Sequence, residues 1–378
     1  MLCGRPHWGA CFRFIEKNNK FWYYENMSYT VKNYIEDKNL LPFYLCGDSL
    51  TVLNMLPDNS VDMVITSPPY WGKREYSSGG IGQEQKYTDF IESMLKISEQ
   101  IFRILKNTGS FWLNIGDTYK NKSMLGIPWR IAIKMMDDQH WIMRNEIIWN
   151  KVKGGMDNST DKLGNVHEQF FHFVKQPKYF YDVDSIRLNP HKAIVKNGSV
   201  ISATGVSGVR YKRQIELSTC LTDTEKQNAM NDLNKILEAI QRGEISDFRM
   251  VIRNQQRTTH SDSIKVSGRA KEIKDKGYYF LKYNPKGAKP RDVWDIIPED
   301  TQNRSVHFAP FPEDLCKIPI LATCPEGGIV LDPFMGTGTS MEVAYSLGRK
   351  SIGIDIAQEY IDFARERTQP TLFEASNA

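Results

Sequence analysis

The stretch Asp332-Pro333-Phe334-Met335-Gly336-Thr337-Gly338-Thr339, here called the glycine loop, decides the fold because it directly follows an apolar, strand-like run at residues 329–331. A second turn, Thr66-Ser67-Pro68-Pro69-Tyr70-Trp71, here called the proline loop, follows a similar run at residues 63–65. Turns in such positions are typical of the carboxyl ends of parallel strands, where open α/β sheets bind ligands. We therefore expect the two loops to lie side by side and to form two adjacent pockets.

Strand-like and helix-like segments alternate around both loops, which predicts an α/β fold with a mostly parallel sheet and helices on both faces. The expected strands are residues 43–48, 61–65, 110–115, 144–149, 169–175, 329–331 and 351–354. The expected helices are residues 50–56, 90–105 (ended by Gly109), 127–136, 340–347 and 358–367. Segments 144–149 and 169–175 are expected to form an antiparallel pair. Since the last two strand and helix units occur only near the end of the chain, one domain should be built from both ends.

Four segments are predicted, with boundaries at residues 1–26, 27–177, 178–300 and 301–378. The first is an N-terminal extension, for which two interpretations stay open: it precedes a natural start at Met27, or it is an ordered arm. The third breaks the alternating pattern with polar and basic residues, and it contains one clear helix. That helix begins with a capping-box pattern at Thr222 and Glu225, and its apolar stripe is expected to pack in a core.

The composition is that of an ordinary globular protein, with 378 residues, 40% hydrophobic and 25% charged. Six cysteines are scattered without paired spacing, which favours reduced thiols in a cytoplasmic protein and predicts no metal site. The sequence HEQFFH at residues 167–172 is no zinc-protease motif, because its histidines are five residues apart in strand-like sequence. No apolar stretch approaches the roughly 20 residues of a membrane span, so no membrane partner is expected.

The glycine loop is expected to bind a cofactor, because its glycines allow a sharp turn and a close approach of the ligand. It lacks the lysine of a phosphate-binding P-loop, which argues against nucleoside triphosphates. Asp355 follows Gly336 at the end of the next predicted strand, at a spacing where a carboxylate meets ribose hydroxyls. This pattern alone permits a dinucleotide or S-adenosylmethionine.

Together the two loops resemble the amino-methylating DNA methyltransferases, specifically the permuted group in which the Ser-Pro-Pro-Tyr segment precedes the glycine loop. The resemblance covers most of residues 43–175 and 291–368. It implies a Rossmann-like methyltransferase fold with a seven-stranded sheet and S-adenosylmethionine as cofactor. Residues 27–177 and 301–378 would form the catalytic domain, and residues 178–300 an inserted target-recognition domain that binds DNA. Protein-glutamine and RNA methyltransferases share a similar tetrapeptide, but their glycine loop typically comes first.

The resemblance also assigns roles to single residues. The Ser67 hydroxyl and the Pro68 carbonyl would accept the hydrogens of the target amine, Pro69 would stiffen the loop, and Tyr70 would stack on a base extruded from the duplex. The cofactor-binding residues implied are Asp48, Phe308, Phe311, Asp332, Phe334, Gly336, Gly338, Thr339 and Asp355. No covalent nucleophile is needed.

The target base is predicted to be cytosine. Family members with serine before Pro-Pro-Tyr usually methylate cytosine N4, whereas aspartate or asparagine usually accompanies adenine N6. Methylation of cytosine C5 is disfavoured because the chain has no Pro-Cys dipeptide to supply a thiol nucleophile. Two alternatives stay open: adenine N6 methylation, and a DNA-binding regulator that has lost turnover.

Positive charge is concentrated in one region. Residues 249–291 contain 12 Lys or Arg and 3 Asp or Glu, although the whole chain has a net charge of only +4. Such a segment suits a polyanion. The residues predicted to contact DNA are Arg253, Gln255, Gln256, Arg257 and His260. The expected partners are double-stranded DNA and, in a restriction-modification system, a cognate restriction endonuclease; the oligomeric state stays open between monomer and homodimer.

Overall fold

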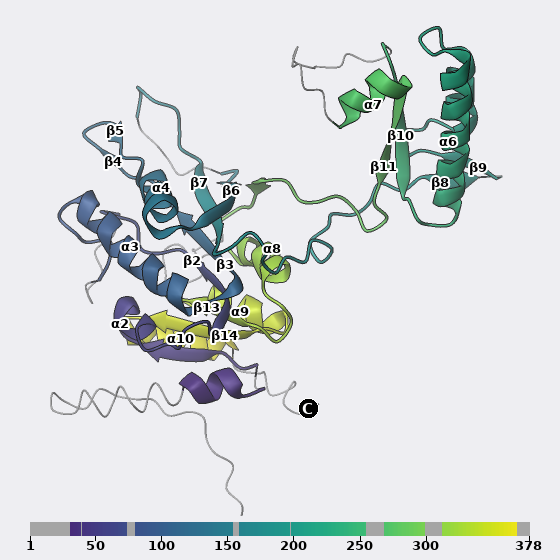
Figure 1. The fold of residues 1–378 in the computed structure, drawn as a ribbon. Coiled ribbons are helices and arrows are strands. Elements are labelled where there is room, and N and C mark those ends of the chain that lie inside the picture. Colours follow the sequence, from purple (N-terminus) through teal and green to yellow (C-terminus); the bar gives the residue numbers. More distant parts are fainter. Residues whose placement is uncertain are drawn as a thin grey trace, which may run out of the picture. The chain divides into compact units, whose positions relative to one another are not determined.

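The computed structural model describes residues 31–38, 40–73, 80–153, 159–196, 198–254, 268–298 and 312–368. The chain forms two compact units (Figure 1). Unit 1 comprises residues 1–182 and 292–378, and unit 2 comprises residues 183–291. The N-terminal extension, residues 1–26, lies outside the described residues.

Unit 1 is built on one large sheet whose strands come from both ends of the chain. The strands lie in the order β1-β14-β13-β2-β3-β7-β6-β12, and only the pairs that involve β7 are antiparallel. The strands are β1 (Phe43–Cys46), β2 (Val61–Thr66), β3 (Leu105–Ile115), β6 (Ile142–Asn150), β7 (His167–Val174), β12 (Val293–Asp295), β13 (Ile329–Asp332) and β14 (Lys350–Asp355). The mostly parallel sheet is thus confirmed.

The described sheet has eight strands rather than the seven expected. The additional strand is β12, in which Val293 and Asp295 pair in parallel with Ile148 and Asn150 of β6. A three-residue strand leaves almost no periodic pattern in a sequence, so its long-range partner defines it.

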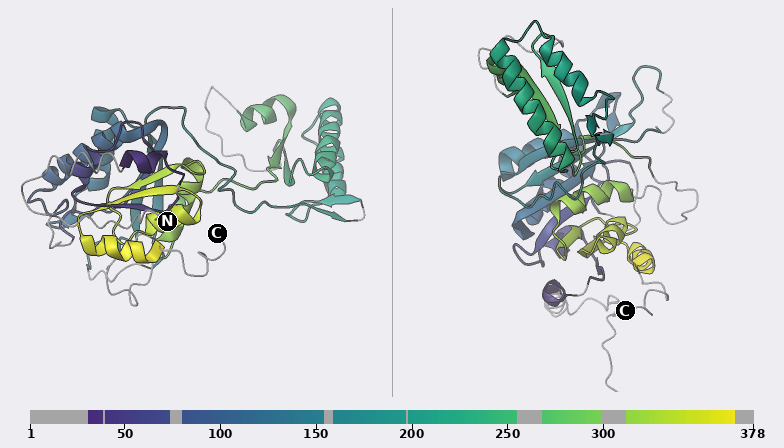
Figure 2. Two further views of the ribbon diagram at one scale, coloured as in Figure 1. Left: turned by 90° about the horizontal axis from the view of Figure 1, so that it is seen from below. Right: turned by 90° about the vertical axis from the view of Figure 1, so that its right-hand side faces the viewer.

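Helices cover both faces of this sheet, as the side chains of β2 show. Val61 and Val64 pack into the core on one side, whereas Met63 and Ile65 pack into the core on the other. Residues of α2, α3 and α4 contribute to the first core, and those of α8 and α9 to the second (Figures 1 and 2). The helices are α2 (Ser49–Leu53), α3 (Tyr87–Ile104), α4 (Ile127–Gln139), α8 (Glu313–Thr323), α9 (Thr339–Ser346) and α10 (Gln358–Thr368). A short hairpin, β4 (Tyr119–Lys120) and β5 (Ser123–Met124), precedes α4.

The junction between α3 and β3 differs from the prediction that Gly109 ends the helix. The helix ends at Ile104, and Leu105 already pairs with Val61 as the first residue of β3. Residues 101, 104 and 105 are apolar at helical spacing, which favours a helix through Leu105. In the structure, Leu105 instead pairs with Val61 in the sheet. Gly109 has a packing role there, because a Cβ at this position would lie 2.7 Å from the backbone oxygen of Asp62.

Unit 2 has a separate core, formed around the apolar face of α6. The predicted capping box is confirmed: the Thr222 hydroxyl accepts from the amide of Glu225, and the Glu225 carboxylate accepts from the amide of Thr222. Its stripe, including Leu233 and Ile236, is buried against β10 and α5 as expected. Two helices were missed, since one was predicted and three are described. The elements are β8 (Ile194–Lys196), β9 (Ser199–Ile201), α5 (Gly208–Glu216), α6 (Asp223–Gln241), β10 (Asp247–Ile252), α7 (Arg269–Lys276) and β11 (Tyr278–Tyr283).

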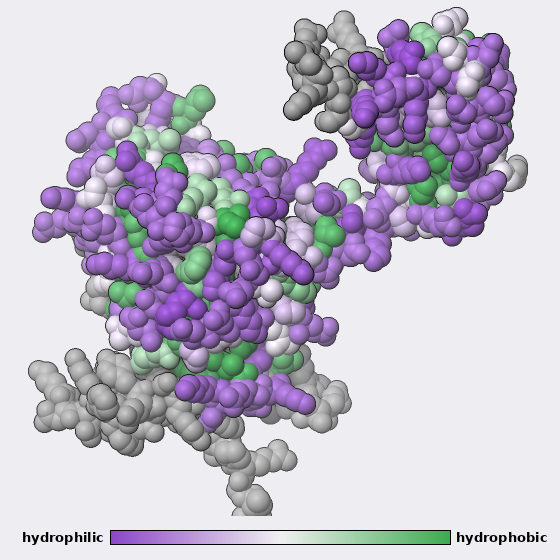
Figure 3. Space-filling model, in the orientation of Figure 1, coloured by the Kyte–Doolittle hydropathy of each residue, from purple (hydrophilic) through white to green (hydrophobic). Residues whose placement is uncertain are grey.

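The surface is largely hydrophilic, with small scattered hydrophobic areas, on the face drawn in Figure 3. Within the described ranges, no helix combines the length and the hydropathy needed to cross a bilayer.

Candidate active site

The two loops lie side by side, because the strands that carry them are neighbours. Val330 and Leu331 of β13 pair in parallel with Met63 and Val64 of β2. At the ends of these strands, the Thr66 hydroxyl donates a 2.7 Å hydrogen bond to the carboxylate of Asp332. The expected juxtaposition of the proline loop and the glycine loop is therefore confirmed.

Asp332 ties the glycine loop to its surroundings. Besides Thr66, its carboxylate accepts from the Phe334 amide at 3.0 Å and from the Ser340 hydroxyl. Burial raises the pKa of Asp332 to about 6, although these hydrogen bonds act in the opposite direction. Both carboxylate oxygens are thus engaged by groups of the protein, which indicates a role in shaping the loop; its direct contact with a cofactor stays a prediction.

Gly336 and Gly338 adopt left-handed backbone conformations, with φ of 51° and 79°. This conformation is costly for residues with a Cβ. At position 338 a Cβ would also lie 2.7 Å from the Cβ of Ala364 in α10. The glycines therefore allow both the sharp turn after β13 and the close packing of the loop against α10.

Asp355 lies at the end of β14, beside the glycine loop. One carboxylate oxygen accepts from the Gly336 amide at 3.0 Å, and the other from the Ala357 amide at 2.9 Å. Burial raises the pKa of Asp355 to about 6. Because each carboxylate oxygen has more than one acceptor site, both can still accept from hydroxyl donors. These two acceptor oxygens fit the hydroxyl groups of the ribose of a nucleoside cofactor.

The segment after β1 adjoins the same loop. The Gly47 amide donates to the Asp355 carbonyl at 2.9 Å, and the Ser49 hydroxyl donates to the Pro333 carbonyl at 2.6 Å. Asp48 itself is exposed and caps α2 by accepting from the amide of Thr51 at 2.9 Å. The predicted contact of Asp48 with the cofactor stays a prediction.

Of the other predicted cofactor residues, two belong to the glycine loop and two lie outside the described residues. Phe334 is half-buried against the core of unit 1. Thr339 is buried, and its hydroxyl accepts from Arg367 at 3.3 Å. Phe308 and Phe311 lie outside the described residues.

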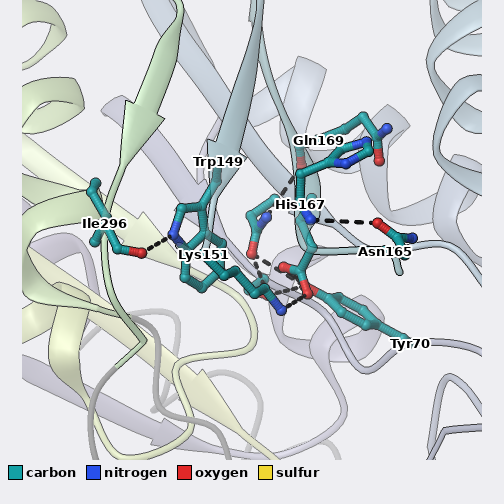
Figure 4. Close-up of polar contacts among 10 residues, drawn as sticks. Tyr70, Trp149, Lys151, Asn165, His167, Gln169 and Ile296 are labelled. Carbon is teal, nitrogen blue, oxygen red and sulfur yellow. Dashed lines mark hydrogen bonds and ion pairs between the residues drawn. The ribbon is translucent and has the colours of Figure 1, made fainter. Parts of the chain in front are cut away.

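The proline loop presents a hydrogen-bonded group of side chains. The Ser67 hydroxyl donates to Oδ1 of Asn114 at 3.1 Å and lies 3.3 Å from the Tyr70 hydroxyl. The Tyr70 hydroxyl in turn donates to Oε2 of Glu168 at 2.7 Å (Figure 4). The Tyr70 ring packs over Gly116, where a Cβ would lie 2.7 Å from it. Pro68 is buried and Pro69 half-buried, so the loop is held firmly at the end of β2.

Two residues of this group were not among the predicted site residues. Asn114 is fully buried at the end of β3, and Glu168 is 9% exposed in β7. The sequence holds one signal for them, because each is a polar residue at one end of an apolar strand-like run. Unpaired polar groups are costly inside a core, so a polar residue in such a position is expected to have a partner. That signal does not say which loop the side chain faces.

The predicted DNA contacts are only partly described. Arg253 is ion-paired with Glu225 at 2.8 Å and donates to the carbonyl of Ile273 at 3.4 Å, so part of its guanidinium is engaged within unit 2. The other four, Gln255, Gln256, Arg257 and His260, lie outside the described residues. Among the residues that are described, no cluster of three or more His, Cys, Asp or Glu side chains is arranged to hold a metal ion.

The fold and the paired loops define a Rossmann-like methyltransferase, and comparison with known proteins gives the family. Residues 61–366 match the family model described as DNA methylase, which covers N6 and N4 amino-methyltransferases. The chain belongs to this family of DNA methylases. Enzymes of this family take their methyl group from S-adenosylmethionine. That this cofactor binds beside Asp355 stays a prediction.

Similar proteins span nearly the whole chain. The Type II methyltransferase M.SfiI of Streptomyces fimbriatus is 28% identical, over 83% of this chain and 88% of that protein. The Type II methyltransferase M.SmaI of Serratia marcescens is 27% identical, over 85% of this chain and 89% of that protein. Among solved structures, the PvuII DNA methyltransferase (cytosine-N4-specific) aligns with a TM-score of 0.51 and 16% identity, over 87% of this chain and 86% of that one. This last likeness supports the fold.

Proposed function

We propose that this DNA methyltransferase transfers the methyl group to the exocyclic N4 amine of cytosine in double-stranded DNA. The observation that carries the proposal is Ser67, the residue before Pro-Pro-Tyr, at the end of a strand that adjoins the cofactor loop. Relatives of similar length are named Type II methyltransferases, and a structural neighbour is named as cytosine-N4-specific. We therefore also propose that the enzyme is the modification part of a Type II restriction-modification system with a cognate endonuclease.

The chemistry requires the protein to prepare the amine. The lone pair of an exocyclic amine is delocalised into the base, so acceptors for its two hydrogens favour a nucleophilic geometry at nitrogen. In the proposed complex the Ser67 hydroxyl and the Pro68 carbonyl are these acceptors. Proline fixes φ and has no N–H, which keeps that carbonyl in one direction. Bound S-adenosylmethionine supplies an activated methyl group, so the side chains contribute orientation and electrostatics.

The Tyr70 ring is proposed to stack on the target base. A base inside a duplex cannot bring its amine to a methyl donor in a protein pocket, so the nucleotide must be extruded. Packing over Gly116 and the hydrogen bond to Glu168 hold the ring at the edge of the site before DNA binds. A ring that is already ordered loses little entropy when a base stacks on it.

Unit 2 is proposed to be the target-recognition domain. Its support is the basic region at residues 249–291, together with the solvent-facing side of α5. Arg210, Lys212 and Arg213 of this helix make no side-chain hydrogen bond or ion pair in the part of the chain that the structure describes. These three cations lie within about one helical turn of each other, an arrangement that suits the phosphates of DNA. The predicted contacts of Arg253, Gln255, Gln256, Arg257 and His260 remain part of this proposal.

The test is incubation of the purified protein with S-adenosylmethionine carrying a labelled methyl group and with unmethylated genomic DNA. The DNA is then digested to nucleosides and analysed by mass spectrometry. N4-methylcytosine as the labelled product supports the proposal, and N6-methyladenine as sole product overturns the base assignment. Tight DNA binding without any methyl transfer would instead favour a regulator. Sequencing of the modified sites identifies the recognition sequence.

A further inference from the structure

Glu168 is a buried carboxylate that faces the proline loop, although it lies in another strand. In β7 it pairs with Trp149 of β6, and its neighbour Gln169 pairs with the last residue of β3. Oε2 accepts from the Tyr70 hydroxyl at 2.7 Å, and Oε1 accepts from the ammonium of Lys151. Each carboxylate oxygen thus has its own donor (Figure 4).

Lys151 is itself held in place. Its ammonium lies 4.9 Å from the centre of the Trp149 ring, and its backbone amide donates to the Val166 carbonyl at 2.9 Å. The Trp149 indole donates to the Ile296 carbonyl at 2.7 Å, which fixes the ring. A cation fixed beside a carboxylate holds that carboxylate in one orientation. Glu168 therefore presents a fixed acceptor to Tyr70.

The Tyr70 hydroxyl carries a single hydrogen, which it can direct to one best acceptor. Among the described residues, three acceptors lie within reach of that hydrogen: Glu168 at 2.7 Å, Asn114 at 3.2 Å and the Ser67 hydroxyl at 3.3 Å. The shorter distance and the negative charge direct that hydrogen to Glu168. Ser67 can then donate its own hydrogen to Asn114 or to the Tyr70 oxygen.

The orientation of the Asn114 amide agrees with this assignment. Its nitrogen donates to the carbonyl of Gln169 at 3.1 Å, which leaves its oxygen facing Ser67. With its hydrogen committed to a neighbour, the Ser67 oxygen keeps a lone pair for a hydrogen of the target amine. A serine hydroxyl whose hydrogen points toward the target amine would instead repel the N–H groups of that amine.

We propose that Glu168, held by Lys151, is a positioning residue for methyl transfer: it takes the hydrogen of Tyr70 and thereby keeps Ser67 an acceptor. The inference rests on the proposed methylation of an amine at Ser67. No bond to Glu168 forms or breaks, and no proton of the substrate passes to it. Its effect is to set the direction of two hydroxyl hydrogens before the substrate amine arrives.

The decisive variant is Glu168→Gln, which keeps the size of the side chain but can turn an amide donor toward Tyr70. The Tyr70 hydrogen then points to Ser67 or Asn114 and competes for the same acceptors. The single-turnover rate of methyl transfer should fall about 10- to 100-fold, less than for loss of a direct transition-state contact. The dissociation constants for S-adenosylmethionine and DNA should stay within about 3-fold. Glu99→Gln, an exposed residue of α3, is the matched control and should match the wild type.

A second variant separates positioning from simple support of the structure. Tyr70→Phe removes the competing hydrogen itself, so it should transfer methyl faster than Glu168→Gln. In the double variant, Glu168→Gln should cause no further loss of rate relative to Tyr70→Phe, because the residue acts through the missing hydroxyl. A role in folding alone would lower the rate equally in both backgrounds. Thermal unfolding of each variant identifies any loss of folded protein.

Three results overturn the proposal: a Glu168→Gln rate equal to that of the wild type, a rate loss fully explained by weaker binding, or additive effects in the double variant. The nucleoside product of the wild type is analysed in the same reactions. This product distinguishes a wrong role for Glu168 from a wrong proposed function. If the wild type makes N4-methylcytosine and the variants behave as in any of these three results, only the role of Glu168 is wrong. If the wild type transfers no methyl group, both proposals are wrong.

Discussion

The Thr66 hydroxyl lies 2.7 Å from the carboxylate of Asp332, although 266 residues separate them in the chain. This hydrogen bond joins the last residue of β2 to the last residue of β13, and so joins the two loops that follow. It places the acceptor side of the site beside the cofactor side. The geometry of methyl transfer therefore depends on a contact between strands from opposite ends of the sequence.

The Asp332→Asn variant should change how stability depends on pH. The pKa of Asp332 is raised to about 6 in the folded protein, so the folded state binds more protons than the unfolded state between pH 4 and 6. Its contribution to stability is fully present below pH 4 and is lost as the pH rises through 6. Because the pKa of Asp332 is about 6 in the folded protein and its ordinary value is 3.8, we expect this loss to be about 3 kcal/mol. Urea unfolding at several pH values should show that the free energy of unfolding declines less with rising pH in the variant than in the wild type. Equal slopes of the free energy of unfolding against pH in the two proteins would contradict this.

Asp355→Asn should weaken the binding of S-adenosylmethionine about 10- to 100-fold at pH 7.5, because hydrogen bonds to a charged acceptor are lost. The wild-type affinity should rise as the pH increases from 5 to 7, since hydroxyl donors favour the ionised carboxylate and its pKa is about 6. Calorimetric titrations at several pH values measure both effects. An affinity that is independent of pH in the wild type would argue against a contact between Asp355 and the ribose.

Ser67→Ala should lower the single-turnover rate of methyl transfer about 100-fold or more, because an acceptor for the amine is lost. Binding of S-adenosylmethionine should be unchanged within error. Quenched-flow measurements with labelled cofactor give the rate. The exposed Ser346 at the end of α9, changed to alanine, serves as the control. A Ser67→Ala rate close to that of the wild type would remove Ser67 from the mechanism.

Gly338→Ala should destabilise the protein by more than the backbone conformation alone explains. An alanine at a φ of 79° costs roughly 1 kcal/mol, and its Cβ would also lie 2.7 Å from that of Ala364. Gly205 has a similar φ of 82°, but a Cβ added there would meet no atom within 4 Å, so Gly205→Ala isolates the backbone cost. We expect Gly338→Ala to exceed this control by about 1–3 kcal/mol in chemical unfolding. Equal losses would show that the loop can move away from α10.

Removal of two cations from α5 should weaken DNA binding in a salt-dependent manner. For Arg210→Ala with Arg213→Ala, the slope of log affinity against log salt concentration should decrease by about 2, because each phosphate contact contributes about 0.9. Arg242→Ala is the matched control, since that guanidinium is already paired with Glu244. Fluorescence anisotropy with duplex DNA at several salt concentrations measures the slopes. An unchanged slope in the double variant would exclude this face of α5 as a phosphate-binding surface.

Much of the fold could be predicted because its signals are local. The apolar runs before both loops, the alternation of strands and helices, and the capping box at Thr222 and Glu225 all depend on neighbouring residues. The errors occurred where tertiary contacts override local preference. Leu105 fits a helix by spacing but pairs with Val61 in the sheet, and β12 exists only through its pairing with β6.

In the active site, too, local features could be predicted from the sequence, whereas tertiary contacts could not. The proline loop and the glycine loop were recognisable because proline and glycine restrict or free the backbone at their own positions. Glu168 was not recognisable as part of the site, since 98 residues separate it from Tyr70 and only the register of β7 directs it there.

The sequence by itself determined the order of the two loops, the residue types within them and the class of chemistry, because these follow from local backbone and side-chain properties. The tertiary structure alone decided which buried groups share hydrogens: Asp332 with Thr66, and Glu168 with Tyr70. Strand register and packing set such partnerships, and neither is encoded in the spacing of residues along the chain.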